Sequence, residues 1–182
     1  AIIHLTSVWC ENNELSRALN EAPEALLTAW NSSWDAALEP ISEAKNLFVL
    51  GRGIGLGIAC EAALKFKEVC GLHAEAFSTA EVLHGPVTIA RAGFRVLVLA
   101  QNDRTLPGVT QFVEKLAARD VTLITAGVGH PSALELPTPS AHPAIEPMLR
   151  IQSFYRMANA LSLRLGLDPD CPPFLQKVTS TV

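Results

Sequence analysis

Apolar runs and amphipathic segments alternate along the chain. Runs of apolar residues within 46–53, 94–101 and 121–127 predict buried strands. Segments with apolar residues at helical spacing separate them, at about 2–38, 59–70, 108–120 and 144–165. Strands that are apolar on both faces and alternate with helices are typical of a parallel sheet covered on both sides. We therefore predict a doubly wound, three-layer α/β sandwich.

Shorter features complete this prediction. Residues 73–77 are a short strand candidate, and residues 79–86 predict one or two helical turns that end at Gly85 and Pro86. Pro23 is expected in the first turn of a second N-terminal helix. The Pro- and Ser-rich stretch 127–143 predicts a loop, and the proline-rich tail 167–182 predicts no regular structure.

Composition and charge exclude several classes of function. The net charge of −4, without a Lys/Arg run, argues against a nucleic-acid surface. No stretch approaches the roughly 18 consecutive apolar residues of a membrane span. The four cysteines form no C-x-x-C pair, which argues against a zinc knuckle, and Cys60 and Cys70 are expected to be buried in one helix. A reducing, cytoplasmic location fits this usage of cysteine.

A glycine-rich loop follows the first predicted strand. Gly51 and Gly53 match the first two positions of a dinucleotide-binding G-x-G-x-x-G motif, but Leu56 occupies the third. No acidic residue follows at the distance where a ribose ligand is needed, so we predict no nucleotide cofactor. Two alternatives remain for this loop, namely an anion site at a helix N-terminus or a tight turn that needs small residues.

The most informative stretch is the helix at 59–70 and the segment after it. Glu61, Lys65 and Glu68 share one helix face by their spacing, which is typical of a solvated salt-bridge row. Their apolar neighbours favour a partly buried face instead, where a carboxylate beside a lysine is able to move a proton. Glu81 and His84 form one E-x-x-H pair, which without a second pair predicts a proton shuttle better than a metal site. We therefore predict no metal.

The ordered elements "GRG", "EAALKFKE", "HAEA" and "EVLHGP" between Gly51 and Pro86 resemble the second domain of the SIS (sugar isomerase) family. The likeness is to the amino-sugar-phosphate members, which are glucosamine-6-phosphate deaminases and isomerising aminotransferases. The tail "DPDCPPFLQKVTSTV" is similar to the closing segment of that family, and it is closer to the deaminase form.

The resemblance implies a role for each matching residue. Glu68 moves a proton between C1 and C2 of the open-chain sugar, and Lys65 stabilises the enediol-like charge. His84, donated by a neighbouring subunit, assists ring opening, and Lys177 approaches the carbonyl end of the substrate. The residues that we expect to contact the substrate are Gly51, Arg52, Gly53, Glu81 and Gln176.

The same resemblance divides the chain into three parts. Residues 1–40 match the helical linker after a first SIS domain, 41–166 form the SIS domain, and 167–182 form an active-site tail. No S-x-S-G-E-T-like segment occurs here, so the residues that bind the phosphate of the substrate are expected outside this chain. The chain alone is therefore expected to have little activity.

Three functions stay open. The first is an isomerising deaminase that converts glucosamine 6-phosphate to fructose 6-phosphate and ammonia. The second is the isomerase part of glutamine–fructose-6-phosphate aminotransferase, and the third is a non-catalytic module that senses a sugar phosphate. We expect a sugar-phosphate ligand and at least a homodimer.

Overall fold

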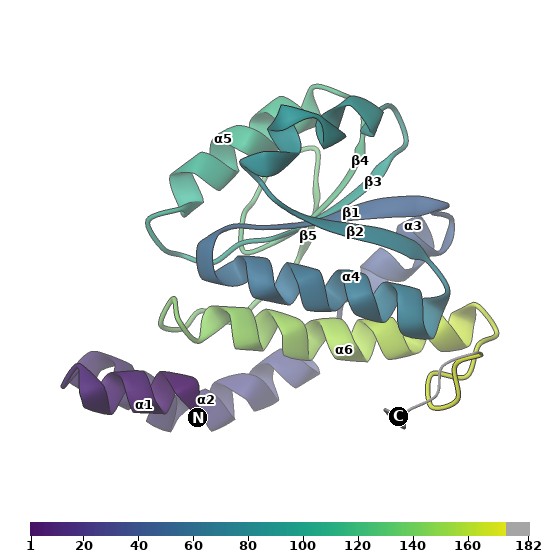
Figure 1. Ribbon diagram of the computed structural model, residues 1–182. Coiled ribbons are helices and arrows are strands. Elements are labelled where there is room, and N and C mark those ends of the chain that lie inside the picture. Colours follow the sequence, from purple (N-terminus) through teal and green to yellow (C-terminus); the bar gives the residue numbers. More distant parts are fainter. Residues whose placement is uncertain (174–182) are drawn as a thin grey trace, which may run out of the picture.

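The fold is a five-stranded parallel sheet between two helical layers, as Figure 1 shows. The computed structural model describes residues 1–173. The strands lie in the order β2-β1-β3-β4-β5, and every neighbouring pair is parallel. They are β1 (Asn46–Gly51), β2 (His73–Ser78), β3 (Arg95–Leu99), β4 (Thr122–Ala126) and β5 (Leu134–Leu136). The prediction of a doubly wound α/β sandwich is confirmed.

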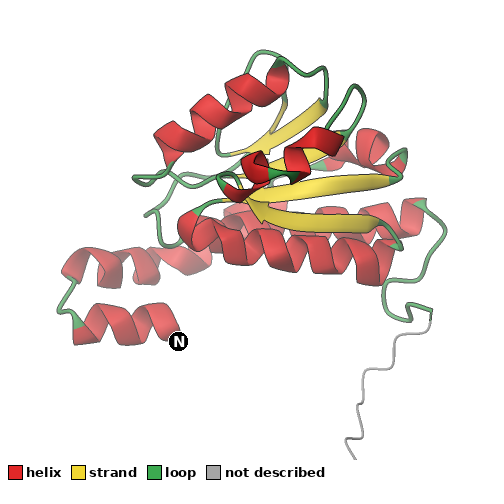
Figure 2. Cartoon of the chain, turned by 45° about the horizontal axis from the view of Figure 1, so that its top comes forward, coloured by secondary structure: helices red, strands yellow, loops and turns green. Residues whose placement is uncertain are grey.

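Each face of the sheet has its own helices. Helices α4 (Leu56–Cys70) and α6 (Glu146–Arg164) pack side by side under one face. Helix α5 (Leu106–Ala117) covers the other face with the 3₁₀ helices η3 (Glu81–His84) and η4 (Pro86–Ile89) (Figure 2). The N-terminal helices α1 (Ile2–Trp9) and α2 (Asn13–Asn31) extend from the α6 side, and α3 (Leu38–Ser42) precedes β1.

The alternation of side chains along β1 explains the two layers. Leu47 and Val49 enter the core under α4 and α6, whereas Phe48 and Leu50 enter the core under α5. Both cores exclude water, so β1 is apolar at successive positions. Burial of both sheet faces provides the main stabilisation of the fold.

The predicted helix ends are largely as the sequence indicates. Helix α4 stops at Gly71, which has φ +60° in the left-handed region that glycine adopts without strain. Pro23, however, lies inside α2 and not in its first turn. Ala22 and Ala29, on either side of the proline, lie in one apolar cluster with Ile145 and Leu149 at the start of α6, and this packing stabilises the helix.

Two further expectations were wrong. The predicted loop 127–143 contains β5, an edge strand of three residues that is too short to show a periodic pattern. Cys60 is exposed, since it lies on the outer side of α4, whereas Cys70 is buried against α6 as expected. No helix within residues 1–173 is long and apolar enough to cross a membrane.

Candidate active site

Lys65 and Glu68 form an ion pair near the C-terminal end of α4. Their Nζ and Oε2 atoms are 2.6 Å apart, and the side chains keep 32% and 24% of their exposure. The pair is therefore reachable by a substrate and yet partly withdrawn from water. A carboxylate and an ammonium group held this close can remove a proton from carbon and stabilise the resulting negative oxygen.

Glu61 and Tyr155 extend the pair into a chain of four polar groups. Glu61 Oε1 is 3.8 Å from Lys65 Nζ, and the Tyr155 hydroxyl donates a hydrogen bond of 2.9 Å to the same oxygen. Tyr155 comes from α6, 94 residues further along the chain. Sequence reasoning missed it, because a tyrosine in an amphipathic helix gives no pattern that points to a partner so distant in sequence.

The network shifts the pKa of two of its members. The hydrogen bond to Glu68 raises the pKa of Lys65, partial burial opposes the rise, and the charge of Glu61 adds to it. Lys65 is therefore protonated and positively charged at neutral pH. Burial, together with the hydrogen bond to Glu61, raises the pKa of Tyr155 to about 12. The tyrosine thus remains a neutral hydrogen-bond donor that fixes the Glu61 carboxylate.

The glycine loop lies at the opposite end of α4. A Cβ at Gly51 would come within 2.5 Å of the Gly55 carbonyl oxygen, and one at Gly55 within 2.3 Å of Gln101 Oε1. Gly53 has a φ of +56°. These close approaches account for the small residues of the loop by packing.

The structure does not bring the glycine loop and Glu68 together. Twelve positions of α4 separate Leu56 from Glu68, which corresponds to about 18 Å at 1.5 Å per residue. Gly51, Arg52 and Gly53 lie beyond that end of the helix. Within one chain they do not reach the same small sugar as Glu68.

Glu81 and His84 are both exposed and belong to η3. Because η3 packs through Val82 into the core under α5, the sheet lies between it and the helix that carries Glu68. One chain therefore does not place His84 beside Glu68. Lys177 and Gln176 lie outside the described residues. Within residues 1–173, no three His, Cys, Asp or Glu side chains gather as a metal-binding group.

Part of the chain matches a known protein family. The model of the SIS domain matches residues 40–127, a stretch that includes the helix with Lys65 and Glu68. Residues 40–127 are therefore a SIS domain. It is 34% identical over 184 aligned positions to a glutamine–fructose-6-phosphate aminotransferase (isomerizing) of Aeropyrum pernix, covering 93% of this chain and 29% of that enzyme.

Two solved structures are similar as well. A protein from Silicibacter pomeroyi, assigned to the phosphosugar isomerases, has a TM-score of 0.83 and 39% identity over 90% of this chain and 50% of its own. Glucosamine-6-phosphate deaminase from Thermotoga maritima shares the fold, with a TM-score of 0.65 and 22% identity over 91% of this chain and 49% of its own. The chain thus spans less than a third of the aminotransferase and about half of each structure.

Proposed function

We propose that this SIS domain supplies the proton-transfer surface of an amino-sugar-phosphate isomerase. The observation that carries the proposal is the 2.6 Å contact between Lys65 and Glu68 on a partly exposed helix face. The similarity of the chain to the aminotransferase of Aeropyrum pernix and to the phosphosugar isomerase from Silicibacter pomeroyi supports a sugar phosphate as the substrate.

The proposed chemistry uses one carboxylate twice. Glu68 removes the proton from C2 of open-chain glucosamine 6-phosphate, and Lys65 stabilises the negative charge that develops on the C1 oxygen. Glu68 then returns the proton to C1, the amino nitrogen gives up a proton and the C1 oxygen takes one up, which leaves a C1 alcohol and an imine at C2. Water adds to the imine carbon and ammonia leaves, giving fructose 6-phosphate.

The positions of Glu68 and His84 favour an active site that two subunits build together. Since the sheet separates the two residues within one chain, both reach one sugar only when they come from different subunits. We therefore propose that a neighbouring subunit donates His84 for ring opening. Lys177 and Gln176 of the 167–182 tail remain proposed substrate contacts, as does Glu81.

We propose the domain division that the family pattern implies. Residues 1–40 would follow a first SIS domain that grips the phosphate, and 41–166 would carry the proton-transfer surface. Lys65 and Glu68 are partly exposed on α4. A first SIS domain that covers them would therefore also exclude water from the reaction.

The direction of the reaction has two candidates. The tail sequence favours the deaminase, whereas the similarity to the Aeropyrum pernix enzyme favours the aminotransferase. Ammonia released from glucosamine 6-phosphate without glutamine identifies the deaminase. Formation of glucosamine 6-phosphate only with glutamine identifies the aminotransferase.

The test of the shared chemistry is Glu68→Gln in the full-length protein. Loss of the base should lower isomerisation by about 10²–10⁴-fold, because general-base catalysis contributes that much. Glu114→Gln, on the exposed side of α5, is the matched control and should leave the rate unchanged. Normal turnover in Glu68→Gln would remove the carboxylate from its role, whereas no turnover by the full-length wild-type protein would favour the sensing module.

A further inference from the structure

Tyr155 is the member of the four-residue polar network that comes from outside α4. Its hydroxyl donates a hydrogen bond of 2.9 Å to Glu61 Oε1. The neighbouring Phe154 is buried and meets Phe66 of α4 edge to face, with ring centroids 5.0 Å apart. This packing fixes α6 against α4, so the core of the domain sets where the Tyr155 hydroxyl lies relative to Glu61.

In the resting arrangement Lys65 occupies the carboxylate that the proposed reaction needs. Lys65 Nζ lies 2.6 Å from Glu68 Oε2, and a carboxylate oxygen that accepts such a charge-assisted hydrogen bond is a weaker base. Glu68 becomes a stronger base for the C2 proton of the substrate when the lysine moves away from it. The same movement is required of Lys65 if it is to stabilise the charge that develops on the substrate oxygen.

Glu61 offers Lys65 a second anionic partner. Glu61 Oε1 lies 3.8 Å from Lys65 Nζ, so the ammonium group is within ion-pair distance of both carboxylates. Lys65 can therefore loosen its contact with Glu68 without losing a counter-charge. The position of Glu61 matters, because a carboxylate that closed fully on Lys65 would hold it away from the substrate. A carboxylate that turned into water would leave the lysine bound to Glu68.

The hydrogen bond from Tyr155 limits the movement of Glu61. The Glu61 side chain is 34% exposed, and an exposed glutamate without a fixed contact samples several rotamers. Because burial and the hydrogen bond to Glu61 raise the pKa of Tyr155 to about 12, the hydroxyl keeps its proton and stays a donor at neutral pH. Tyr155 thus holds Glu61 at one place beside Lys65 before a substrate arrives.

We propose that Tyr155 is a positioning residue of the proton-transfer surface, which holds Glu61 where it shares Lys65 with Glu68 and so frees Glu68 to act as the base. This inference rests on the proposed function and adds a residue from α6 to it. Tyr155 itself exchanges no proton with the sugar. Its effect is therefore expected in kcat, which reports the proton transfer, and not in KM.

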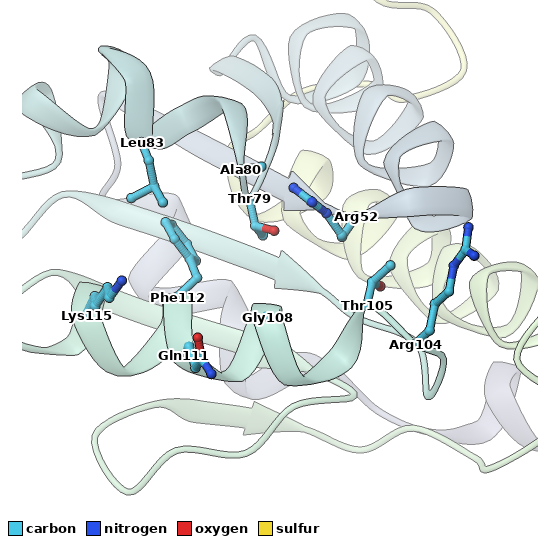
Figure 3. A pocket seen from close by; sticks show the side chains of 10 residues that line it. All are labelled: Arg52, Thr79, Ala80, Leu83, Arg104, Thr105, Gly108, Gln111, Phe112 and Lys115. Atoms are coloured by element: carbon cyan, nitrogen blue, oxygen red, sulfur yellow. The ribbon is translucent and has the colours of Figure 1, made fainter.

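The large cavity of the domain is separate from this network. It has a volume of about 610 Å³ and opens between the segments that follow β1 and β2 and helix α5, with Arg52 and Lys115 in its lining (Figure 3). Of the residues within 1–173 that line it, none belongs to the network. A substitution at Tyr155 should therefore leave the cavity unchanged, and its effect can be assigned to the contacts on α4.

The test is steady-state kinetics of the full-length protein with glucosamine 6-phosphate that carries protium or deuterium at C2. Tyr155→Phe keeps the ring and removes the hydroxyl. It should lower kcat by about tenfold and leave KM within about twofold of the wild-type value. The deuterium isotope effect on kcat should be at least as large as in the wild type, because the slowed step is the proton transfer.

A double-mutant cycle and a control show whether the hydroxyl acts through Glu61. If it does, Tyr155→Phe should have no further effect on kcat in a protein that already carries Glu61→Ala. Ser162→Ala is the matched control, since the Ser162 hydroxyl also joins α6 to α4, through a bond of 2.6 Å to the Val69 carbonyl oxygen. It should lower the resistance to urea and leave kcat unchanged.

The outcomes separate this inference from the proposed function. An unchanged kcat in Tyr155→Phe would overturn the inference, as would a loss confined to KM or fully additive losses in the double variant with Glu61→Ala. Normal turnover in Glu68→Gln would contradict the proposed function and this inference with it. Loss of turnover in Glu68→Gln beside an unimpaired Tyr155→Phe would overturn this inference alone.

Discussion

Two carboxylate–cation pairs lie on neighbouring helices, and their surroundings differ. Lys65 and Glu68 on α4 are about one third and one quarter exposed. Glu146 and Arg150 on α6 are 3.1 Å apart, and each residue is only 3% exposed. Both pairs have ordinary helical spacing, so spacing alone does not separate them.

The contacts of the α6 pair explain its role. Glu146 Oε2 also accepts the Asn102 amide at 2.7 Å, which ties the loop after β3 to the start of α6. Burial lowers the pKa of Arg150, and the charge of Glu146 opposes that shift. A buried pair of this kind holds loops in place, whereas a half-exposed pair remains available to a substrate.

The largest expected effect is on the buried pair. Glu146→Gln should lower the free energy of unfolding by about 3–5 kcal/mol, because it leaves the Arg150 charge buried without a counterion. Urea unfolding measures the change. Glu43→Gln breaks the Arg95–Glu43 pair, whose carboxylate is 64% exposed, and should cost less than about 1 kcal/mol. Equal losses in the two variants would contradict the distinction.

A substitution in the half-exposed pair of Lys65 and Glu68 should lower the rate of isomerisation more than the stability of the fold. Lys65→Met should change the free energy of unfolding by less than about 1 kcal/mol and lower isomerisation by about 100-fold. Lys67→Met, two residues further along the same helix and exposed, is the control for both measurements. A stability loss as large as that of Glu146→Gln would make Lys65 a structural residue.

Tyr155 allows the α4 network to be measured directly, since it is the single tyrosine of the chain. Its tyrosinate absorbance should titrate with a pKa of about 12, and Glu61→Gln should lower that pKa. The folded chain holds this proton more tightly than the unfolded chain. Its contribution to stability is therefore complete below about pH 10 and is lost as the pH rises further. A midpoint near 10 in the folded wild type would show that the Glu61 contact is absent.

The smallest expected effect concerns the packing of α4 against α6, the two helices that carry these pairs. Cys70 Sγ donates to the Ala158 carbonyl of α6 at 3.5 Å, and burial raises the pKa of this thiol to about 12. Iodoacetamide should modify the exposed Cys60 while the protein is folded and leave Cys70 intact. Rapid labelling of Cys70 would mean that α4 and α6 separate, and the buried layer would then lose its protection.

The sequence predicted the strands and most helices because their buried faces impose a regular spacing of apolar residues along the chain. The apolar runs at β1, β3 and β4 and the stop at Gly71 were correct. It did not predict β5, which is short and at the edge, nor the passage of α2 through Pro23. In both places tertiary contacts outweigh the local preference.

The candidate site was predictable in part. The spacing of Lys65 and Glu68 put them on one face, and the structure shows them in contact. Tyr155, the buried state of the Glu146–Arg150 pair, and the cavity around Arg52 were not predictable, since each joins segments far apart in sequence.

The sequence by itself determined the class of fold and the likeness to the SIS family, because periodic burial and ordered motifs are both local properties of a chain. Only the tertiary structure decided which charged pair is buried and which is open, and that neither the glycine loop nor His84 of the same chain lies beside Glu68. The physical reason is that burial and distance depend on which helices and strands become neighbours, and spacing along one helix does not contain that information.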